Sequence, residues 1–331
     1  MEKIKKIIVG VSTYGLLPRA EGFIKNFWSN TESPKDIEIV PVCVDDGTPN
    51  VKVVREREKF CKDWNFNFIG HEKNLGIPAA WNSLASFDKE ADLVVIANDD
   101  CRLLSPGWLS RFIHFFEKNE NIGTVGLPLV SEMGFKDDDE RWLGKPGRVG
   151  AAVGCFFAIR PQDAFSVENP DDSRGWWISL RSFHEEIHMG FKLAEQGKIS
   201  LMLPWMPVYH QGGQTFASSP ELVWMDPTPY VTMDEFLFWV RQSRWYVESF
   251  EEEYAKGHVD RMSMSRIMFS KHWGILDEVT AGRRVQRVGN EDDVDIFDSP
   301  QKLVHERVVT PIPPREVVYL DKEGKEQKAT V

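Results

Sequence analysis

Two adjacent carboxylates follow an apolar run in the stretch VVIANDDCRLLSPGWL, residues 94–109. Asp99 and Asp100 stand side by side, where burial and mutual repulsion both disfavour keeping the two groups ionised. A positively charged partner at this place would remove this cost. The simpler alternative is that both side chains face water.

Similar polar clusters stand at the ends of three other apolar runs. Together with Asn98–Asp100 they comprise Ser12–Tyr14, Asp45–Thr48, and Asn74 with Gly76 and Asn82. Asx and glycine residues commonly form turns and helix caps, so one such cluster alone indicates only a loop. Because the pattern repeats after successive runs, it predicts a crevice for a polar ligand.

The first 130 residues alternate segments typical of strands and helices. Strands are predicted at 6–12, 37–44, 66–70, 93–97 and 122–130, and helices at 18–30, 51–63, 77–88 and 106–118. This alternation predicts an α/β fold with a Rossmann-like, doubly wound, mainly parallel sheet. Right-handed crossovers would place the carboxyl ends of the strands at one edge, where such folds bind ligands. We therefore expect the polar clusters at that edge.

The chain changes character after residue 150. Further strands are predicted at 150–159, 199–203 and 207–210, and helical segments at 177–197 and 232–273. The second helical segment has an apolar stripe of Phe236, Trp239, Val240, Trp245 and Phe250. Near the end, Arg283, Arg284, Arg287 and the acidic EDDVDIFD precede a hairpin predicted to turn at Asp321–Gly324.

These patterns predict three parts of the chain. We expect a main domain at 1–217, a helical C-terminal extension at 218–280 and a tail at 281–331. The tail is expected to be partly disordered or to pack on a partner. If the tail packs on a partner, that partner could be a second copy of the chain, which would give a homo-oligomer formed through the C-terminal region.

Composition excludes several classes of function. The formal net charge of −11 argues against an extended nucleic-acid surface, which needs an excess of lysine and arginine. Four scattered cysteines without a C-x-x-C pair predict reduced thiols and a cytoplasmic protein. We expect no transmembrane segment, because no apolar run approaches ~18 residues. The absence of phosphate-loop and G-x-G-x-x-G motifs disfavours P-loop enzymes and dinucleotide dehydrogenases.

Five motifs in order resemble a known family. VDDGTP, NLGIPAAWN, ANDDCRLLSPGWL, FHEEIHMGFKLAEQG and VYHQGGQTF are similar to motifs of nucleotide-sugar-dependent glycosyltransferases of the GT-A fold, family 2. The resemblance covers about residues 5–217, and FSKHWG at 269–274 is similar to the Lys-Trp-Gly ending of many members. It implies a metal-dependent, inverting, hexosyl-type transfer from a UDP-like donor to a hydroxyl group of a saccharide or another acceptor.

The resemblance also implies roles for individual residues in binding the nucleotide sugar. Thr13 and Tyr14 would lie against the base and ribose, and Asp45 would accept a hydrogen bond from a uracil-type N–H. The remaining residues implied to bind the donor are Asn74, Gly76, Asn82 and Asp99.

The chemical roles fall on a second group of residues. Asp100, at the last position of the D-x-D element, and His210 would hold Mn²⁺ or Mg²⁺. Glu186 is the first choice for the catalytic base and Glu185 the second. The chain departs from the family at two points: Trp81 stands where many relatives have arginine, and Glu186 replaces the usual aspartate.

Two other functions remain open from the sequence. HEEIH at 184–188 matches the H-E-x-x-H motif of zinc metalloproteases, in which His184 and His188 would share one helix face. The chain could also be a nucleotide-sugar-binding protein without activity, although the presence of Glu185, Glu186 and His210 favours an enzyme.

Tryptophans before the predicted base helix have two interpretations. Trp176 and Trp177 could stack on a sugar, at the acceptor side or in a lid that moves at Gly175. The alternative is that they pack in the core.

Overall fold

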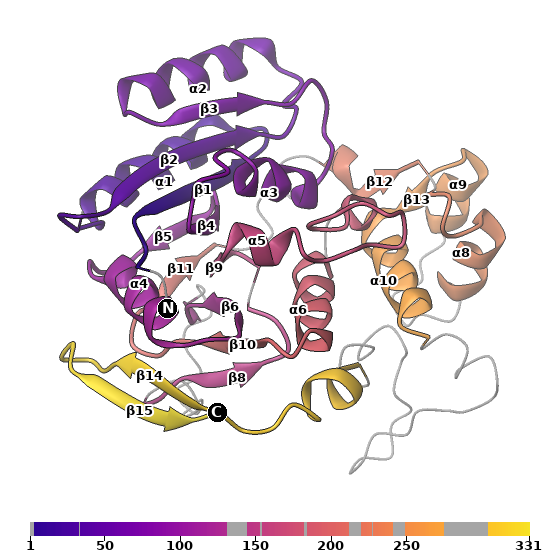
Figure 1. Ribbon diagram of the computed structural model, residues 1–331. Coiled ribbons are helices and arrows are strands. Elements are labelled where there is room, and N and C mark those ends of the chain that lie inside the picture. Colours follow the sequence, from indigo (N-terminus) through magenta and orange to yellow (C-terminus); the bar gives the residue numbers. More distant parts are fainter. Residues whose placement is uncertain are drawn as a thin grey trace.

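The computed structural model describes residues 3–32, 34–130, 144–152, 154–181, 184–211, 220–226, 228–240, 249–274 and 304–331. An eight-stranded sheet passes through it, in the order β3-β2-β1-β4-β9-β6-β10-β8 (Figure 1). Its strands are β1 (Lys6–Thr13), β2 (Glu38–Asp45), β3 (Asn67–Gly70), β4 (Leu93–Asn98), β6 (Ile122–Gly126), β8 (Gly147–Val149), β9 (Phe156–Ile159) and β10 (Ile199–Met202). Strands β8 and β9 run antiparallel to their neighbours, and the others are mutually parallel. The predicted α/β fold is confirmed.

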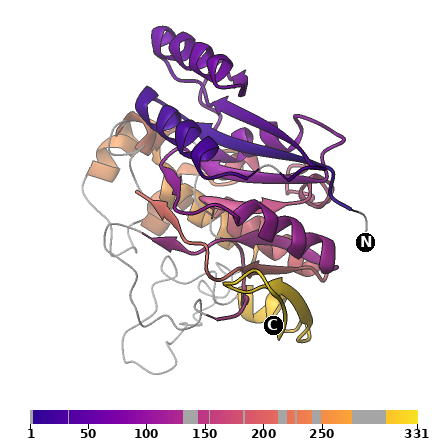
Figure 2. The same cartoon turned by 90° about the vertical axis from the view of Figure 1, so that its left-hand side faces the viewer.

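Helices cover both faces of the sheet (Figures 1 and 2). The first four are α1 (Leu17–Ser29), α2 (Val51–Asp63), α3 (Ile77–Ala85) and α4 (Trp108–Lys118). Successive residues of a strand point to opposite faces, so β1 contributes to two cores. Val9 belongs to the apolar cluster with Phe27 of α1, whereas Ile8 belongs to the cluster with Leu84 of α3. Burial on both faces explains why the strands are apolar throughout.

Local signals account for helix positions. Asn50 Oδ1 accepts hydrogen bonds from the backbone N–H groups of Lys52 and Val53, at 3.1 and 3.4 Å, and so caps α2. Gly10 allows α3 to approach β1 closely, since a Cβ there would lie 2.4 Å from Leu84 Cδ2. The absence of a side chain at Gly10 therefore lets Leu84 of α3 pack directly on β1.

Three predicted elements are shorter than expected. The run 122–130 divides into β6 and β7 (Leu129–Val130), and β7 joins a separate sheet with β5 (Cys101–Leu103) and β11 (Val208–His210). The strand predicted at 150–159 is reduced to β9. The helix predicted at 177–197 is a short 3-10 turn, η2 (Ile178–Leu180), followed by α6 (Glu185–Glu195). His184 interrupts it, because a φ of +67° is incompatible with a right-handed helix.

The C-terminal extension is not one continuous helix. It contains α8 (Met233–Val240), α9 (Ser249–Ala255) and α10 (Arg261–His272), and a pair of short strands, β12 (Trp224–Met225) and β13 (Val259–Asp260). Phe236 is buried as predicted. For Trp239, Val240 and Phe250 the structure describes the backbone and not the side chain, and Trp245 lies outside the described residues. Helix α10 packs on α6, where the Phe191 and Phe269 rings are 6.1 Å apart.

The described part of the tail packs on this chain's own first domain. A π-helical turn, η4 (His305–Val309), leads to a hairpin of β14 (Glu316–Leu320) and β15 (Glu326–Thr330), as predicted. Asn119 at the end of α4 exchanges two hydrogen bonds of 2.7 Å with the Val318 backbone. Figures 1 and 2 both show the hairpin beside α4. Residues 304–331 therefore pack on another part of the same chain. The predicted arginine trio and acidic run lie outside the described residues.

None of the described helices is both long enough and apolar enough to cross a membrane.

Candidate active site

The predicted edge exists, and the strand pairing aligns its polar clusters. In the sheet register Thr13 lies opposite Asp45 on one side, and Ser12 lies opposite Asn98 on the other. The clusters that end β1, β2 and β4 therefore meet, as the parallel arrangement predicts.

The two adjacent aspartates occupy different environments. Thr13 Oγ1 donates a hydrogen bond of 2.5 Å to Asp99 Oδ2, which ties Asp99 to the end of β1. Burial raises the pKa of Asp99 to about 6, although the Thr13 hydrogen bond opposes the shift. Asp100 Oδ1 instead lies 3.2 Å from His210 Nε2. The pair is therefore tolerated partly because each carboxylate has a separate partner.

Strand pairing brings His210 to Asp100. In the small sheet β11 runs antiparallel to β5, and His210 lies opposite Cys101, the residue after Asp100. The pKa of His210 is raised to about 10, first by the hydrogen bond with Asp100 and then by Cys155, whose Sγ lies 3.6 Å from Nδ1. Both predicted metal ligands thus lie together.

The ligand set fits a divalent cation. Among the described residues, the group whose ligand atoms all lie within 4.8 Å of one another is Asp100, Cys101 and His210. A carboxylate and an imidazole suit Mn²⁺, and two side chains leave coordination positions for phosphate oxygens. Cys101 is fully buried, and its thiol donates to the Cys155 carbonyl at 3.1 Å. Sequence reasoning missed both cysteines, although Cys101 directly follows Asp100.

The two candidate bases stand at the amino end of α6. Burial raises the pKa of Glu186 to about 7, whereas burial and the neighbouring Glu186 raise the pKa of Glu185 well above its usual value. Glu186 lies against Gly154, where a Cβ would be 3.2 Å from its carboxyl carbon. Glu185 is only 4% exposed, and its Oε2 has no hydrogen-bond partner among the described residues. Glu186, which is partly exposed, is better placed to accept a proton.

Asp45 lies at the predicted edge but is paired within the protein. Buried Arg57 donates from Nη1 to Asp45 Oδ2, and the Thr48 N–H donates to Oδ1 at 2.7 Å. Arg57 also donates to the Gly15 carbonyl at 2.9 Å. Asp45 is 1% exposed, so its visible contacts hold the loops after β1 and β2 together.

A second carboxylate organises the loop after β3. Asp46 accepts hydrogen bonds from the Asn74 side chain at 2.8 Å and from the N–H groups of Leu75 and Gly76 at 3.0 and 2.9 Å. Gly76 has a φ of +95°, and a Cβ there would lie 2.5 Å from the Arg181 carbonyl oxygen. Asn74 and Gly76 therefore shape this loop at the strand edge.

Trp176 and Trp177 form part of the protein interior, and the half-buried Asn82 is hydrogen-bonded to the Trp176 backbone. The Asn82 amide donates to the Trp176 carbonyl and accepts from its N–H, each at 2.8 Å. Trp176 and Trp177 are 0% and 1% exposed, and the Trp176 ring lies 5.8 Å from that of Trp81. Aromatic packing covers both rings, which favours the alternative of core packing, and a role for these two tryptophans at the acceptor side or in a lid stays a prediction.

The H-E-x-x-H match does not produce a metal site among the described residues. His184 precedes α6 in a left-handed conformation, so it does not share a helix face with His188. His188 is fully buried and contacts Asn169 Oδ1 at 3.2 Å through Nε2. Burial lowers the pKa of His184 to about 3 and that of His188 well below its usual value.

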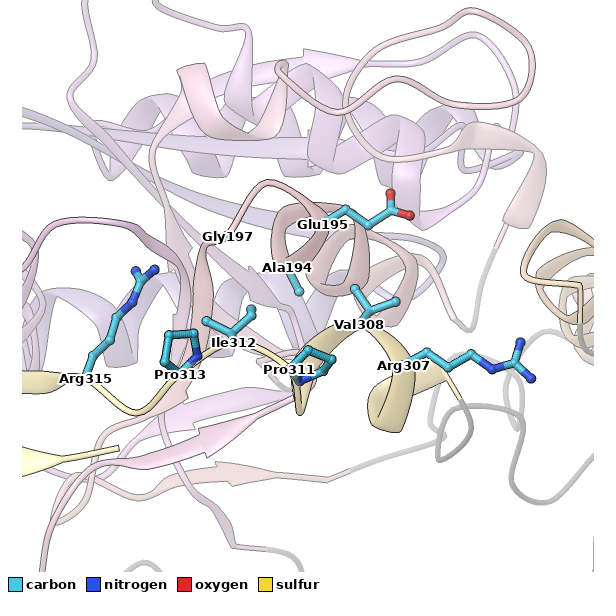
Figure 3. A pocket seen from close by; sticks show the side chains of 9 residues that line it. All are labelled: Ala194, Glu195, Gly197, Arg307, Val308, Pro311, Ile312, Pro313 and Arg315. Atoms are coloured by element: carbon cyan, nitrogen blue, oxygen red, sulfur yellow. The ribbon is translucent and has the colours of Figure 1, made fainter.

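A cavity of about 480 Å³ lies at the other end of α6 (Figure 3). Ala194 and Glu195 line one wall, and tail residues that include Arg307, Ile312 and Arg315 line the other. It is separate from Glu186, because it borders the carboxyl end of α6 rather than the amino end. We assign it no part in the chemistry.

Comparisons with known proteins give a family and a fold for this chain. Residues 9–187 match the model of the family described as Glycosyl transferase family 2. No curated protein matches the sequence. The solved structure described as GalNAc-T7 with UDP, GalNAc and Mn²⁺ is similar in fold, with a TM-score of 0.53 and 14% identity over 86% of this chain. The match spans 60% of that structure's length.

Two further solved structures are similar at lower scores. One is the mannosyltransferase PcManGT from Pyrobaculum calidifontis in complex with GDP-Man and Mn²⁺, with 13% identity, coverage of 94% of this chain and 81% of that chain, and a TM-score of 0.49. The other is S. aureus TarS 1–349, with 15% identity, coverage of 85% and 75%, and a TM-score of 0.47.

Proposed function

Since the chain belongs to glycosyl transferase family 2 and has the GT-A fold, we propose that it is a metal-dependent enzyme that uses a nucleoside diphosphate sugar. It would transfer a hexosyl-type sugar from a UDP-like donor to a hydroxyl group of a saccharide or another acceptor, with inversion. The observation that carries this proposal is the pair Asp100 and His210, 3.2 Å apart at the end of β4.

The strand edge supplies the donor site. Thr13 and Tyr14 would contact the base and ribose, and Asp99, held by Thr13, would lie beside them. Asp45 Oδ1, which accepts a hydrogen bond from the Thr48 N–H, would also accept one from an N–H group of the base. Three further residues would hold the loops around the donor: Asn74, Gly76 and Asn82.

Asp100 and His210 would hold the cation, Mn²⁺ or Mg²⁺. It would supply positive charge against the phosphates of the leaving nucleoside diphosphate. Glu186 would accept the proton of the acceptor hydroxyl on the opposite side of the sugar. A pKa near 7 suits a general base, because a large fraction is ionised at neutral pH and the group still binds protons well.

The division into a domain at 1–217, an extension at 218–280 and a tail at 281–331 remains part of the proposal. A cytoplasmic location and a homo-oligomer formed through the C-terminal region are further predictions. All four cysteines are buried free thiols, which is compatible with a reducing compartment.

A thermal-shift screen of UDP, GDP, CDP and ADP, each with and without Mn²⁺, tests the proposal. A ligand at a hundred times its dissociation constant stabilises the folded state by about 2.7 kcal/mol, which is readily measured. We expect UDP with Mn²⁺ to give the largest shift, followed by turnover of the matching nucleotide sugar. Stabilisation without any turnover would support the inactive binding protein instead, and no stabilisation by any nucleotide would contradict the proposal.

A further inference from the structure

Two arginines from distant parts of the chain meet beside the loop that follows β3. Arg181 follows η2, and its Nη1 donates to the Leu75 carbonyl at 2.7 Å. Arg261 is the first residue of α10, and its Nη1 lies 3.4 Å from Asn74 Oδ1, at the long limit for a hydrogen bond. Within the described part of the chain, neither guanidinium is paired with a carboxylate.

Arg261 is buried without a full set of partners. Its side chain belongs to a residue that is 9% exposed, and its Nε has no hydrogen-bond partner among the described residues. Burial lowers the pKa of Arg261, and the positive charge of Arg181 lowers it further. Burying a cation beside another cation is costly unless an anion lies between them.

Asp46 and Asp260, the two carboxylates whose charges act on Arg261, form hydrogen bonds with other groups. Asp46 accepts from the loop at 74–76 and contacts His71 Nδ1 at 2.9 Å. Asp260 caps α10 by accepting a hydrogen bond of 2.6 Å from the Ser263 N–H. Within the described residues neither carboxylate forms an ion pair with the two guanidinium groups, although the negative charges of Asp46 and Asp260 both act on Arg261.

The arginines border the proposed donor site. Asp46, in the loop after β2, holds the Asn74 side chain, and Arg261 contacts Asn74 Oδ1, so Arg261 lies beside the loops that follow β2 and β3. Hydrogen bonds fix the backbone around the two arginines. The Ile77 N–H donates to the Arg181 carbonyl at 2.8 Å, and the Ser265 hydroxyl of α10 donates to the Leu180 carbonyl. The positions of both side chains are thus set by the loop after β3 and by α10.

We propose that Arg261 and Arg181 form an anion site that binds the diphosphate of the nucleotide donor, so that α10 of the C-terminal extension completes the donor pocket. The inference rests on the proposed function. Arginine presents a planar fork of N–H donors that matches phosphate oxygens and stays ionised at neutral pH. Arg261 lies outside residues 9–187, so the family match assigns it no role.

Isothermal titration with UDP and uridine, each with Mn²⁺, separates phosphate recognition from base recognition. The proteins are the wild type, Arg261→Gln, Arg181→Gln and the control Lys256→Gln, which removes an exposed charge in the same extension. We expect Arg261→Gln to weaken UDP roughly ten- to a hundredfold, the range for a charge-assisted hydrogen bond, and to leave uridine within about twofold. Equal loss for both ligands, or no loss for UDP, would overturn the inference.

Inorganic pyrophosphate in the presence of a chelator tests the site without nucleotide or metal. Binding by the wild type and its loss in Arg261→Gln would support the anion site, even if no nucleotide bound and the proposed function failed. If neither pyrophosphate nor UDP depends on Arg261 or Arg181, the anion site is rejected, while Mn²⁺-dependent binding of UDP would leave the proposed function standing.

Thermal unfolding of the ligand-free proteins tests whether Arg261 acts only by stabilising the fold. Removing one of two like charges relieves repulsion, so the ligand-free unfolding temperature of Arg261→Gln should lie within a few degrees of the wild type or above it. Arg261→Lys keeps the charge but loses the fork, and should bind UDP with intermediate affinity. A large loss of stability in Arg261→Gln, with full UDP affinity in Arg261→Lys and Arg181→Gln, would contradict the proposal.

Discussion

His210 Nε2 lies 3.2 Å from Asp100 Oδ1, and the same imidazole places Nδ1 3.6 Å from the Cys155 thiol. These neighbours favour the protonated ring and raise the pKa of His210 to about 10. A cation bound by Asp100 and His210 would displace that proton, so metal binding and proton release are coupled at this site.

Asp100→Ala and His210→Ala should each abolish the Mn²⁺-dependent part of UDP binding. Each removes one of the two ligand side chains, whereas the hydrogen bond that fixes Asp99 to Thr13 remains. Calorimetric titration of UDP with and without Mn²⁺ measures this part directly. Asp36→Ala, which removes a carboxylate that is 81% exposed, is the control. An unchanged Mn²⁺ dependence in both site variants would reject the metal assignment.

Glu186→Gln should lower the transfer rate by ~10²-fold or more and leave donor affinity unchanged, because the amide keeps the shape but cannot accept the proton. Glu185→Gln, at the less exposed neighbouring position, should have a smaller effect. Single-turnover kinetics with saturating donor separate rate from affinity.

The zinc metalloprotease hypothesis makes a different prediction for the same segment. Stoichiometric zinc that survives dialysis and is lost in His184→Ala or His188→Ala would overturn the transferase assignment. We expect only weak, exchangeable Mn²⁺ or Mg²⁺ in metal analysis of the purified protein.

The raised pKa of Glu186 also predicts two pH dependences. Activity should fall about tenfold per pH unit below pH 7, because the base becomes protonated there. The folded-state pKa of about 7 lies above the usual 4.5, so the carboxyl group favours folding fully below pH 4.5 and loses that contribution as pH rises to 7.

Glu186→Gln should therefore raise the free energy of unfolding at pH 8 relative to the wild type, by at most about 3 kcal/mol. The difference should be much smaller at pH 4. Urea unfolding of both proteins at the two pH values measures it. A difference that is independent of pH would show that the effect comes from packing rather than from ionisation.

Gly175→Ala should destabilise the fold more than Gly197→Ala. Both glycines have positive φ, +94° and +75°, so each substitution introduces backbone strain of about 1 kcal/mol. Only at Gly175 would the new Cβ meet another atom, Asn82 Oδ1 at 2.3 Å, and disturb the paired hydrogen bonds to Trp176. We expect an additional loss of about 1–3 kcal/mol in urea unfolding. Equal losses would show that Asn82 can move away freely.

Asn119→Ala should release the C-terminal hairpin. The variant loses both hydrogen bonds to Val318, while the neighbouring α4 core remains. Limited proteolysis should then cut within 304–331 faster than in the wild type, with little change in the protection of 3–130. Lys118→Ala, whose exposed ion pair with Glu326 contributes little, is the matched control. Equal cleavage rates in both variants would show that other contacts hold the hairpin.

Much of the fold could be predicted because parallel strands buried on both faces have a strong local pattern. The runs that became β1, β2, β3 and β4 were found within about two residues, and the polar residues after them do meet at one edge. That result needs only the alternation of strands and helices and the handedness of their connections. The element that was misjudged most, the helix at 177–197, is broken at His184 by a backbone conformation that side-chain periodicity does not report.

The α/β architecture and the residue types at the strand ends thus follow from local patterns in the chain. Which of these residues meet depends on the packing of whole elements: β11 pairs with β5 and brings His210 to Asp100, and α10 places Arg261 beside Asn74. The same packing makes Trp176 and Trp177 interior residues and pairs Asp45 with Arg57. Such contacts join segments far apart in the chain, so they depend on how whole elements pack, and no local pattern of residues encodes them.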